Sequence, residues 1–455
     1  MKHKIHFPIK KNDVVQLEIT GMTAEGCGVG RCKEIAVFVP YTAIGDIIEA
    51  KILKVAKTYA FGKMISLLTA SQDRIEIDCK YFTKCGGCTY RHMAYQAELA
   101  VKEQRVKDAL NRIGGFSDLP MKPIVGAKQP DHYRNKAQLP IGIDDNQSMI
   151  MGFYSNRSHR IIDCESCALQ PQSFTQAMDA FRKWADTSGN DVYREQTGKG
   201  RMRHLYLREA GATGEVMACV VVNGNGLYHE DTLVKQLREH VHGLKSVIIN
   251  SNRENTNVIL GKKCRTVWGS DTIKDTLCGL TFHISPVNRV QTEKLYAIAK
   301  EYAGLTGEEI LLDLYCGTGT IGLSMAHQAK KLIGVEVIEA AVDNARKNAQ
   351  VNGIENAEFI CGDAANAAEM LEQQGLRPNV IVIDPPRKGC DQSLIKTISR
   401  MAPDRVVYVS CDPATLARDL KWFTEEGYMP KEVTPVDMFP RTAHVETVDL
   451  LSRKE

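Results

Sequence analysis

The stretch EILLDLYCGTGTIGLSMA, residues 309–326, decides the fold of the C-terminal part of the chain. An apolar run is followed by a glycine-rich turn and then by a second apolar segment, which is the pattern of a buried strand, a loop and a helix. Similar patterns recur at residues 331–353, 379–390 and 405–420. Repeated units of this kind predict an α/β fold, with a parallel, doubly wound sheet over residues 286–455.

The turn in this stretch indicates a ligand that contains a nucleoside. Gly317, Gly319 and Gly322 match the pattern G-x-G-x-x-G between a strand and a helix, a pattern that binds dinucleotides. The next strand ends at Glu336, whose carboxylate can accept hydrogen bonds from ribose hydroxyl groups. NAD and S-adenosylmethionine (SAM) both contain such a ribose, so these features leave both cofactors open.

Three aspartates favour SAM over NAD. Asp313 precedes the glycine turn, where an anion attracts a sulfonium and an ammonium group but repels a pyrophosphate. Asp363, after the third strand, can accept a hydrogen bond from the exocyclic amine of adenine. Asp384 is projected into the site by Pro385 and Pro386, which stiffen the turn and remove two backbone donors. SAM is therefore the predicted cofactor.

The turn after the strand at 406–409 contains Cys411, directly before a helix that is predicted to begin near Ala414. Methylation of carbon 5 of uracil requires such a thiol, because that carbon is a poor nucleophile until a thiolate adds to carbon 6 and makes an enolate. A base must then remove the proton from carbon 5. Glu446, at the start of the last predicted strand, is the candidate base. The alternatives are a buried, inert Cys411 and a merely exposed Glu446, but both residues beside a methyl-donor site favour catalysis.

Composition places the chain among globular proteins. Its 455 residues predict about two to four domains, and its 43% hydrophobic content excludes general disorder. It has neither an apolar run of membrane-spanning length nor a signal-peptide pattern at its start. We therefore expect a cytoplasmic protein, and a monomer is the default expectation. The net charge of +3 permits a nucleic-acid partner without requiring one.

The N-terminal part is predicted to be a small β-barrel. Residues 9–69 alternate short apolar strands with glycine-rich turns, and about five strands in this length suggest the OB type, which often binds nucleic acids. Residues 1–70 carry ten basic and six acidic side chains, a balance of +4 that suits RNA. A barrel with a structural role alone is the alternative.

Residues 71–285 are predicted to form a central α+β domain with a helix over 94–115. The part between 131 and 167 is rich in cationic and aromatic side chains, which suit RNA phosphates and unstacked bases. The cations are Arg134, Lys136, Arg157, His159 and Arg160, and the aromatic residues are Tyr133, Phe153 and Tyr154. A charged surface over buried aromatic residues would give the same pattern.

A cysteine-rich segment predicts a metal site. CKYFTKCGGC, residues 79–88, contains Cys79, Cys85 and Cys88, and DCESC adds Cys164 and Cys167. In a reducing compartment, clustered thiols bind metal more often than they form disulfides. Thiolates around a glycine turn suit either one zinc ion or an iron–sulfur cluster with four cysteine ligands. The spacing leaves both metals open, and it leaves open which cysteine of the later pair is the fourth ligand.

Together these motifs resemble those of the RNA 5-methyluridine methyltransferases, specifically the 23S ribosomal RNA branch that contains an iron–sulfur cluster. The resemblance covers essentially the whole chain and rests on the N-terminal barrel of TRAM type and on CKYFTKCGGC, LDLYCGTGT, DPPRKG, SCDPATLARDL and HVE. It implies methyl transfer from SAM to carbon 5 of one uridine, or two, in 23S ribosomal RNA. The target base would be extruded from the folded RNA to reach the thiol.

The resemblance also implies roles for individual residues. Cys411 matches the nucleophile of the family and Glu446 matches its base. The ligands of a [4Fe–4S] cluster match Cys79, Cys85, Cys88 and Cys167. The donor-binding positions match Gln291, Tyr315, Glu336 and Asp384, and Asp363 fits the same site. The cluster is implied to support folding and RNA placement rather than redox chemistry.

Two other functions fit parts of the pattern. A tRNA uracil-5-methyltransferase would use the same chemistry, but that branch is expected to be shorter and to lack the barrel and the cluster. A non-catalytic iron–sulfur protein that binds RNA would have no use for Cys411, Glu446 and Asp384. We therefore predict three parts, namely a TRAM-type barrel at 1–70, a cluster-bearing central domain at 71–285 and a methyltransferase domain at 286–455.

Overall fold

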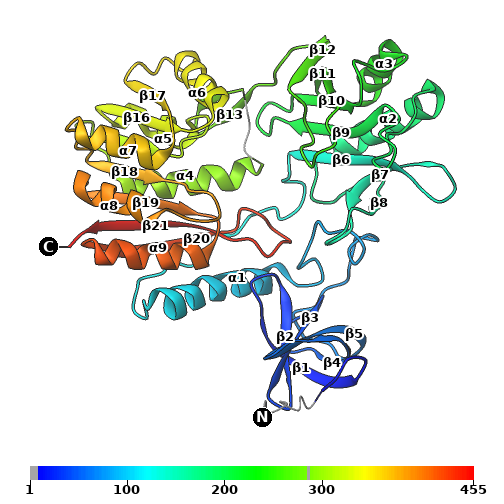
Figure 1. The fold of residues 1–455 in the computed structure, drawn as a ribbon, viewed down its shortest axis with the longest axis horizontal. Helices are drawn as coiled ribbons and strands as arrows, with labels where there is room; N and C mark the ends of the chain where they lie inside the picture. The colour runs from blue at the N-terminus through cyan, green and yellow to red at the C-terminus, as the bar shows by residue number, and fades with distance from the viewer. Residues whose placement is uncertain (1–8, 284–286, 455) are drawn as a thin grey trace. The chain divides into compact units, whose positions relative to one another are not determined.

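The computed structural model describes residues 9–283 and 287–454, which form two compact units (Figure 1). The first unit consists of the chain up to Arg105 together with Phe439–His444, and the second consists of Val106–Met438 together with the chain from Val445 onward. The predicted domain boundary between residues 285 and 286 lies outside the described residues. Within them, no helix is long and apolar enough to cross a membrane.

The first unit contains the predicted barrel, which is closed by five strands in the order β1-β2-β3-β5-β4. Along these strands apolar side chains alternate with polar ones, so that Leu17, Ile19 and Val37 are buried inside. A Cβ atom on Gly28 would lie 2.0 Å from Thr42 Oγ1, so glycine permits the close approach of β2 to the segment between β3 and β4. The strands are β1 Val14–Met22, β2 Cys27–Cys32, β3 Ile35–Pro40, β4 Ile47–Val55 and β5 Tyr59–Thr69.

The helix that was predicted over 94–115 is confirmed. α1 covers Tyr95–Ala109 and continues as one π-helical turn, η1 Leu110–Gly114. Gly115 ends it in the left-handed conformation, with φ at 79°, which glycine adopts at low cost.

The second unit contains a central seven-stranded sheet in the order β12-β11-β10-β9-β6-β7-β8. β10 and β11 pair in parallel, and the other neighbouring strands of this sheet are antiparallel. Helices α2 Gln172–Ser188 and α3 Glu230–His240 pack against each other beside it, and α2 is a helix that the sequence analysis did not identify. The strands are β6 Lys136–Ile143, β7 Met149–Tyr154, β8 Ile161–Asp163, β9 Met202–Glu209, β10 Val216–Val222, β11 Leu244–Ser251 and β12 Lys263–Gly269.

A short hairpin, β13 Asp275–Leu277 and β14 Leu280–Phe282, leads to a second seven-stranded sheet in the order β17-β16-β15-β18-β19-β21-β20. The first five of these strands are parallel, as predicted. The last two are not, because β20 and β21 form an antiparallel hairpin and β21 lies between β19 and β20. The strands are β15 Ile310–Leu314, β16 Lys331–Glu336, β17 Ala357–Cys361, β18 Val380–Ile383, β19 Arg405–Ser410, β20 Tyr428–Val436 and β21 Glu446–Arg453.

Apolar cores cover both faces of this second sheet, which Figure 1 colours from yellow to red. One core joins the sheet to α7, α8 and α9, and the other joins it to α4, α5 and α6. Ligands therefore reach such a sheet at the carboxyl ends of its strands, next to the point where the strand order reverses. The helices are α4 Arg289–Ala303, α5 Thr320–Met325 with the 3-10 turn η2 Ala326–Gln328, α6 Glu339–Val351, α7 Ala364–Gln373, α8 Gln392–Met401 and α9 Pro413–Glu425.

Candidate active site

Strand register brings the predicted donor-binding residues to one edge of the second sheet. β15 runs parallel to β16 on one side and to β18 on the other, and all three strands end at the same level. From β15 the chain continues to β16 on one side and later returns to β18 on the other, so the strand order reverses here. Doubly wound sheets bind their ligands in the crevice at this point. The side chains at these strand ends are Tyr315, Glu336 and Asp384.

The same edge carries the predicted nucleophile and base. β19 is parallel to β18, and Ile383 pairs with Tyr408, so Cys411 follows β19 at the same carboxyl edge, two residues beyond the level of Asp384. β21 is antiparallel to β19, and Ser410 pairs with Thr447. The antiparallel direction that the sequence did not predict therefore places Glu446, the first residue of β21, at the carboxyl edge.

Two backbone amides fix Glu336, one in the glycine turn and one just after β16. Gly317 N–H donates to Glu336 Oε2 at 3.1 Å, and Ile338 N–H donates to Oε1 at 2.9 Å. Gly317 and Tyr315 both have positive φ angles, 57° and 66°, so the chain turns sharply after β15. A Cβ atom on Gly317 would meet open space, which leaves room for a ligand against the turn.

Two buried side chains hold acceptor atoms that find no donor among the described residues. Asp313 is 1% exposed, and its Oδ2 accepts from Gly322 N–H at 2.9 Å, while its Oδ1 has no partner. Gln291 is fully buried and donates through Nε2 to two backbone carbonyls, which leaves Oε1 without a donor. Buried acceptors are normally satisfied, so these atoms fit a ligand that carries ammonium and hydroxyl donors, as SAM does.

Asp363 has a structural role that the sequence analysis did not assign. Its Oδ1 caps α7 by accepting from Ala365 N–H at 3.1 Å and Asn366 N–H at 3.2 Å. Asp363 is exposed at the end of β17, the strand beside β16. Because only Oδ1 takes part in the cap, Oδ2 is left to accept from an adenine amine.

Cys411 lies in a turn that is built by its neighbours. Asp412 caps α9 by accepting from Ala414 N–H at 2.9 Å and Thr415 N–H at 3.1 Å, and Pro413 is the first helical residue. The thiol is thus held next to a helix N-terminus, whose partial positive charge favours a thiolate. This cap explains the sequence that follows the cysteine.

The ionisable groups at this edge influence one another. Burial, together with the Glu446 and Asp384 carboxylates, raises the pKa of the Cys411 thiol to about 11. Burial, together with Asp384, raises the pKa of Glu446 to about 8. Burial raises the pKa of Asp384 to about 7. Interacting groups with raised pKa values are typical of catalytic sites.

Arg387 is a functional candidate that the sequence analysis did not assign. Its positive charge acts to lower the pKa of both Cys411 and Glu446, against the effect of burial. The available signal was its place directly after the two prolines that follow Asp384, in a stretch that already pointed to the site.

The predicted metal ligands are divided between the two units. Cys79, Cys85 and Cys88 belong to the first unit, where all three are half-buried and Gly87 N–H donates to Cys85 Sγ at 3.3 Å. Cys167 belongs to the second unit and is also half-buried. Across the described residues no three His, Cys, Asp or Glu side chains are gathered as metal ligands. The cluster therefore stays a prediction from the sequence.

Comparison with known proteins identifies the relatives of the chain. Residues 281–454 match the family model described as tRNA (Uracil-5-)-methyltransferase, and residues 9–65 match the TRAM domain. The chain is 43% identical to an uncharacterized RNA methyltransferase of Clostridium tetani over 99% of this chain and 98% of the relative. It is also 43% identical to one of Halalkalibacterium halodurans over 98% of each chain.

One solved structure resembles nearly the whole chain. It is the crystal structure of a Pyrococcus abyssi tRNA (uracil-54, C5)-methyltransferase in complex with S-adenosyl-L-homocysteine, with a TM-score of 0.78 and 26% identity over 96% of this chain and 100% of that chain. The expectation that tRNA enzymes of this kind are shorter is wrong for this relative, so length does not separate the two RNA substrates. The relatives and the strand-end site together show that the chain is a SAM-dependent RNA methyltransferase and belongs to the RNA uracil-5-methyltransferase family.

Proposed function

We propose that this enzyme methylates carbon 5 of a uridine, or of two, in 23S ribosomal RNA, with Cys411 as the nucleophile and Glu446 as the base. The observation that carries the chemistry is the meeting of these two residues with Asp384 at one edge of the sheet, beside the glycine turn. The ribosomal substrate rests on the sequence motifs, including the cysteine segment at 79–88. We also propose the three-part division at 1–70, 71–285 and 286–455, and a monomer.

The donor-binding residues are proposed to hold SAM along the carboxyl edge. The Glu336 carboxylate, oriented by two amides, would bind the ribose, and Asp363 Oδ2 would bind the adenine amine. Gln291, Tyr315 and Asp384 would hold the remainder. When bound, SAM would supply a methyl group on a positively charged sulfur, and Asp384, whose charge acts on Cys411, would hold that group near the thiol.

The proposed reaction proceeds through a covalent RNA adduct. The Cys411 sulfur bonds to carbon 6 of uracil, and the electrons of the ring double bond move to the oxygen on carbon 4. Carbon 5 would then bond to the methyl group, and the bond between that group and the sulfur of SAM would break. Glu446 removes the proton from carbon 5, the double bond forms again, and the Cys411 thiolate leaves. Glu446 finally returns its proton to water.

Trapping of the adduct tests the role of Glu446. In Glu446→Gln, addition and methyl transfer proceed but proton removal fails, so we expect a denaturation-resistant complex of protein and methylated RNA on a gel. Glu339→Gln is the matched control, because Glu339 is exposed at the start of α6. The assignment fails if Glu446→Gln forms no retarded species with an RNA that the unaltered enzyme methylates.

The RNA substrate is tested by offering both candidates. Unmodified 23S ribosomal RNA fragments and unmodified tRNA would be incubated with the enzyme and labelled SAM. We expect 5-methyluridine in the ribosomal fragments. The similarity to the Pyrococcus abyssi tRNA enzyme makes tRNA the second candidate, and methylation of tRNA alone would overturn the ribosomal assignment while leaving the chemistry intact.

We further propose that Cys79, Cys85, Cys88 and Cys167 hold a [4Fe–4S] cluster. The half-buried thiols and the amide that donates to Cys85 Sγ suit thiolate ligands. Protein purified without oxygen should contain four iron and four sulfide ions per chain, and Cys85→Ser should lower both. Cys264→Ser, at an exposed cysteine outside the set, should leave the iron content unchanged. Stoichiometric zinc without sulfide would contradict the proposal.

A further inference from the structure

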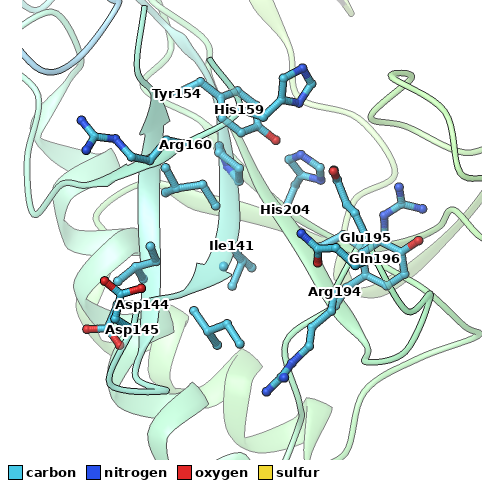
Figure 2. A pocket seen from close by; sticks show the side chains of 17 residues that line it. Ile141, Asp144, Asp145, Tyr154, His159, Arg160, Arg194, Glu195, Gln196 and His204 are labelled. Atoms are coloured by element: carbon cyan, nitrogen blue, oxygen red, sulfur yellow. The ribbon is translucent and has the colours of Figure 1, made fainter.

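The central sheet of the second unit contains a pocket that is distinct from the candidate active site. It has a volume of about 510 Å³ and is lined by parts of β6, β7, β8 and β9 and by the segment from Tyr193 to Gln196 (Figure 2). All lining residues lie between Pro140 and His204, so none comes from the SAM-binding sheet. Pockets of this size bind small organic groups.

The walls of the pocket suit a flat, partly apolar ring. Four isoleucines, at positions 141, 143, 150 and 161, contribute apolar surface. Tyr154 is half-buried, and its ring lies 5.5 Å from that of His159 at 48°. One positive charge is fixed nearby, since Arg203 lies 4.4 Å over the Tyr193 ring and donates to two backbone carbonyls at 2.8 Å. A rigid wall of this kind binds without a large loss of side-chain entropy.

His204 provides a hydrogen-bonding group inside the pocket. Its side chain is 9% exposed, and Nδ1 has no partner among the described residues. Burial lowers the pKa of His204 to about 4, so the ring is neutral at pH 7 and offers one donor and one acceptor. Figure 2 shows His204 between Tyr154 on one side and Glu195 and Gln196 on the other.

The charges at the rim disfavour a ligand made mainly of phosphate. Asp144, Asp145 and Glu195 accompany the cations Arg160 and Arg194. A ligand with a neutral ring inside and a single phosphate linkage outside matches this mixture, because the exposed Arg160 remains available to the linkage. An unpaired nucleotide within an RNA chain has this form.

We infer that the pocket binds one unpaired base of the RNA substrate, other than the uridine that is methylated. The base stacks on Tyr154, and His204 contacts its hydrogen-bonding edge. Recognition of single-stranded RNA commonly combines stacking on an aromatic ring with contacts to the base edge. The inference rests on the proposed RNA substrate, and it adds a second point of recognition that determines which uridine reaches Cys411.

A double-mutant cycle between protein and RNA tests this inference. RNA fragments that carry one abasic nucleotide at successive positions would be titrated with the unaltered enzyme and with Tyr154→Ala. Stacking of one base contributes about 1–3 kcal/mol, so Tyr154→Ala should weaken binding about 5- to 150-fold. One abasic position should cause a similar loss with the unaltered enzyme and little further loss with the variant. Tyr154→Phe should restore binding, because stacking does not need the hydroxyl group.

The control is Tyr228→Ala, which removes an exposed tyrosine that stacks on Arg201 at 4.1 Å and does not line the pocket. Its effect should add to that of every abasic position. In addition, His204→Ala should weaken the preference for one base at the coupled position. Purely additive effects for Tyr154→Ala at all positions would overturn the inference. Methylation of the same RNA by the unaltered enzyme would show that the proposed function stands independently.

Discussion

The two seven-stranded sheets of the second unit place their polar residues in different ways. In the methyltransferase sheet, the parallel strands from β17 to β19 bring successive turns to one edge. Glu336 ends one of these strands, and Tyr315, Asp384 and Cys411 directly follow others. In the central sheet, most neighbouring strands are antiparallel, so successive turns lie at alternate edges. Its pocket is therefore built from strand interiors as well as turns, with His204 inside β9.

This difference explains why chemistry can be predicted from one sheet and not from the other. In a parallel sheet, a polar residue that follows an apolar run lies at the carboxyl edge, so its position can be predicted from the local sequence. In an antiparallel sheet this is possible only when the pairing register is known. For example, His204 is buried because it pairs with Pro140 on β6 and with Val221 on β10, which no local pattern indicates.

The largest expected effect is a loss of methylation rate that occurs on substitution of one cysteine, Cys411, and not of another at the same edge of the methyltransferase sheet. Cys411→Ala should lower the methylation rate by about 10³-fold or more, because carbon 5 is not activated without the thiolate. Cys361→Ala, at the exposed end of β17, should leave the rate within about twofold. Single-turnover transfer of labelled methyl groups measures both. Equal losses would show that the edge as a whole, rather than the thiol, is needed.

The next effect is a pH dependence of proton removal. Glu446 must be ionised to act as a base, and its pKa is raised to about 8. Once the covalent adduct has formed, Cys411 no longer titrates, so the rate of tritium release from carbon 5 of the adduct should rise about tenfold per pH unit below pH 8 and then level off. Arg387 lowers this pKa, so Arg387→Gln should move the profile to higher pH. A profile that is flat between pH 6 and 8 would contradict the assignment of Glu446.

The sequence was sufficient to predict the strands that local apolar runs define and the turns between these strands. The helix predicted to begin near Ala414 does begin at Pro413, and Cys411 lies in the turn before it. The antiparallel direction of β21 was missed, because it depends on how the chain returns from β20 rather than on the composition of either strand. The influence of Arg387 on Cys411 was missed for a similar reason, since charge effects depend on distances between separate turns.

A smaller effect concerns stability, and it should distinguish functional from structural carboxylates. The pKa of Asp384 is about 7 in the folded enzyme and 3.8 as its ordinary value, so the folded state holds the proton more tightly. Stability from this group is present below pH 4 and is lost as the pH rises through 7. Asp384→Asn should therefore stabilise the SAM-free enzyme by about 2 kcal/mol at pH 8, after allowance for solvent screening, and by little at pH 4.

Denaturant unfolding at both pH values measures this difference, and the same variant should lose methylation activity. Asp391→Asn serves as the control, because the Asp391 side chain is 67% exposed at the start of α8. It should change stability by less than about 0.5 kcal/mol at either pH. A stabilisation by Asp384→Asn that does not depend on pH would show that ionisation of this aspartate is not its cause.

The smallest effect tests whether the wall of the central pocket is rigid. Arg203 is 6% exposed, donates to the carbonyls of Asn252 and Glu254, and stacks on Tyr193. Lysine keeps the charge but loses the planar group that makes these contacts at once, so Arg203→Lys should lower the free energy of unfolding by about 1 kcal/mol. Arg238→Lys is the control, because this arginine of helix α3 lies 4.9 Å over the ring of Trp268 on β12 of the same sheet. Its loss should be about half as large, because a more exposed stacking contact contributes less. Equal losses would mean that the carbonyl contacts add nothing, and the central sheet would then lack the fixed wall that distinguishes its pocket from an ordinary surface hollow.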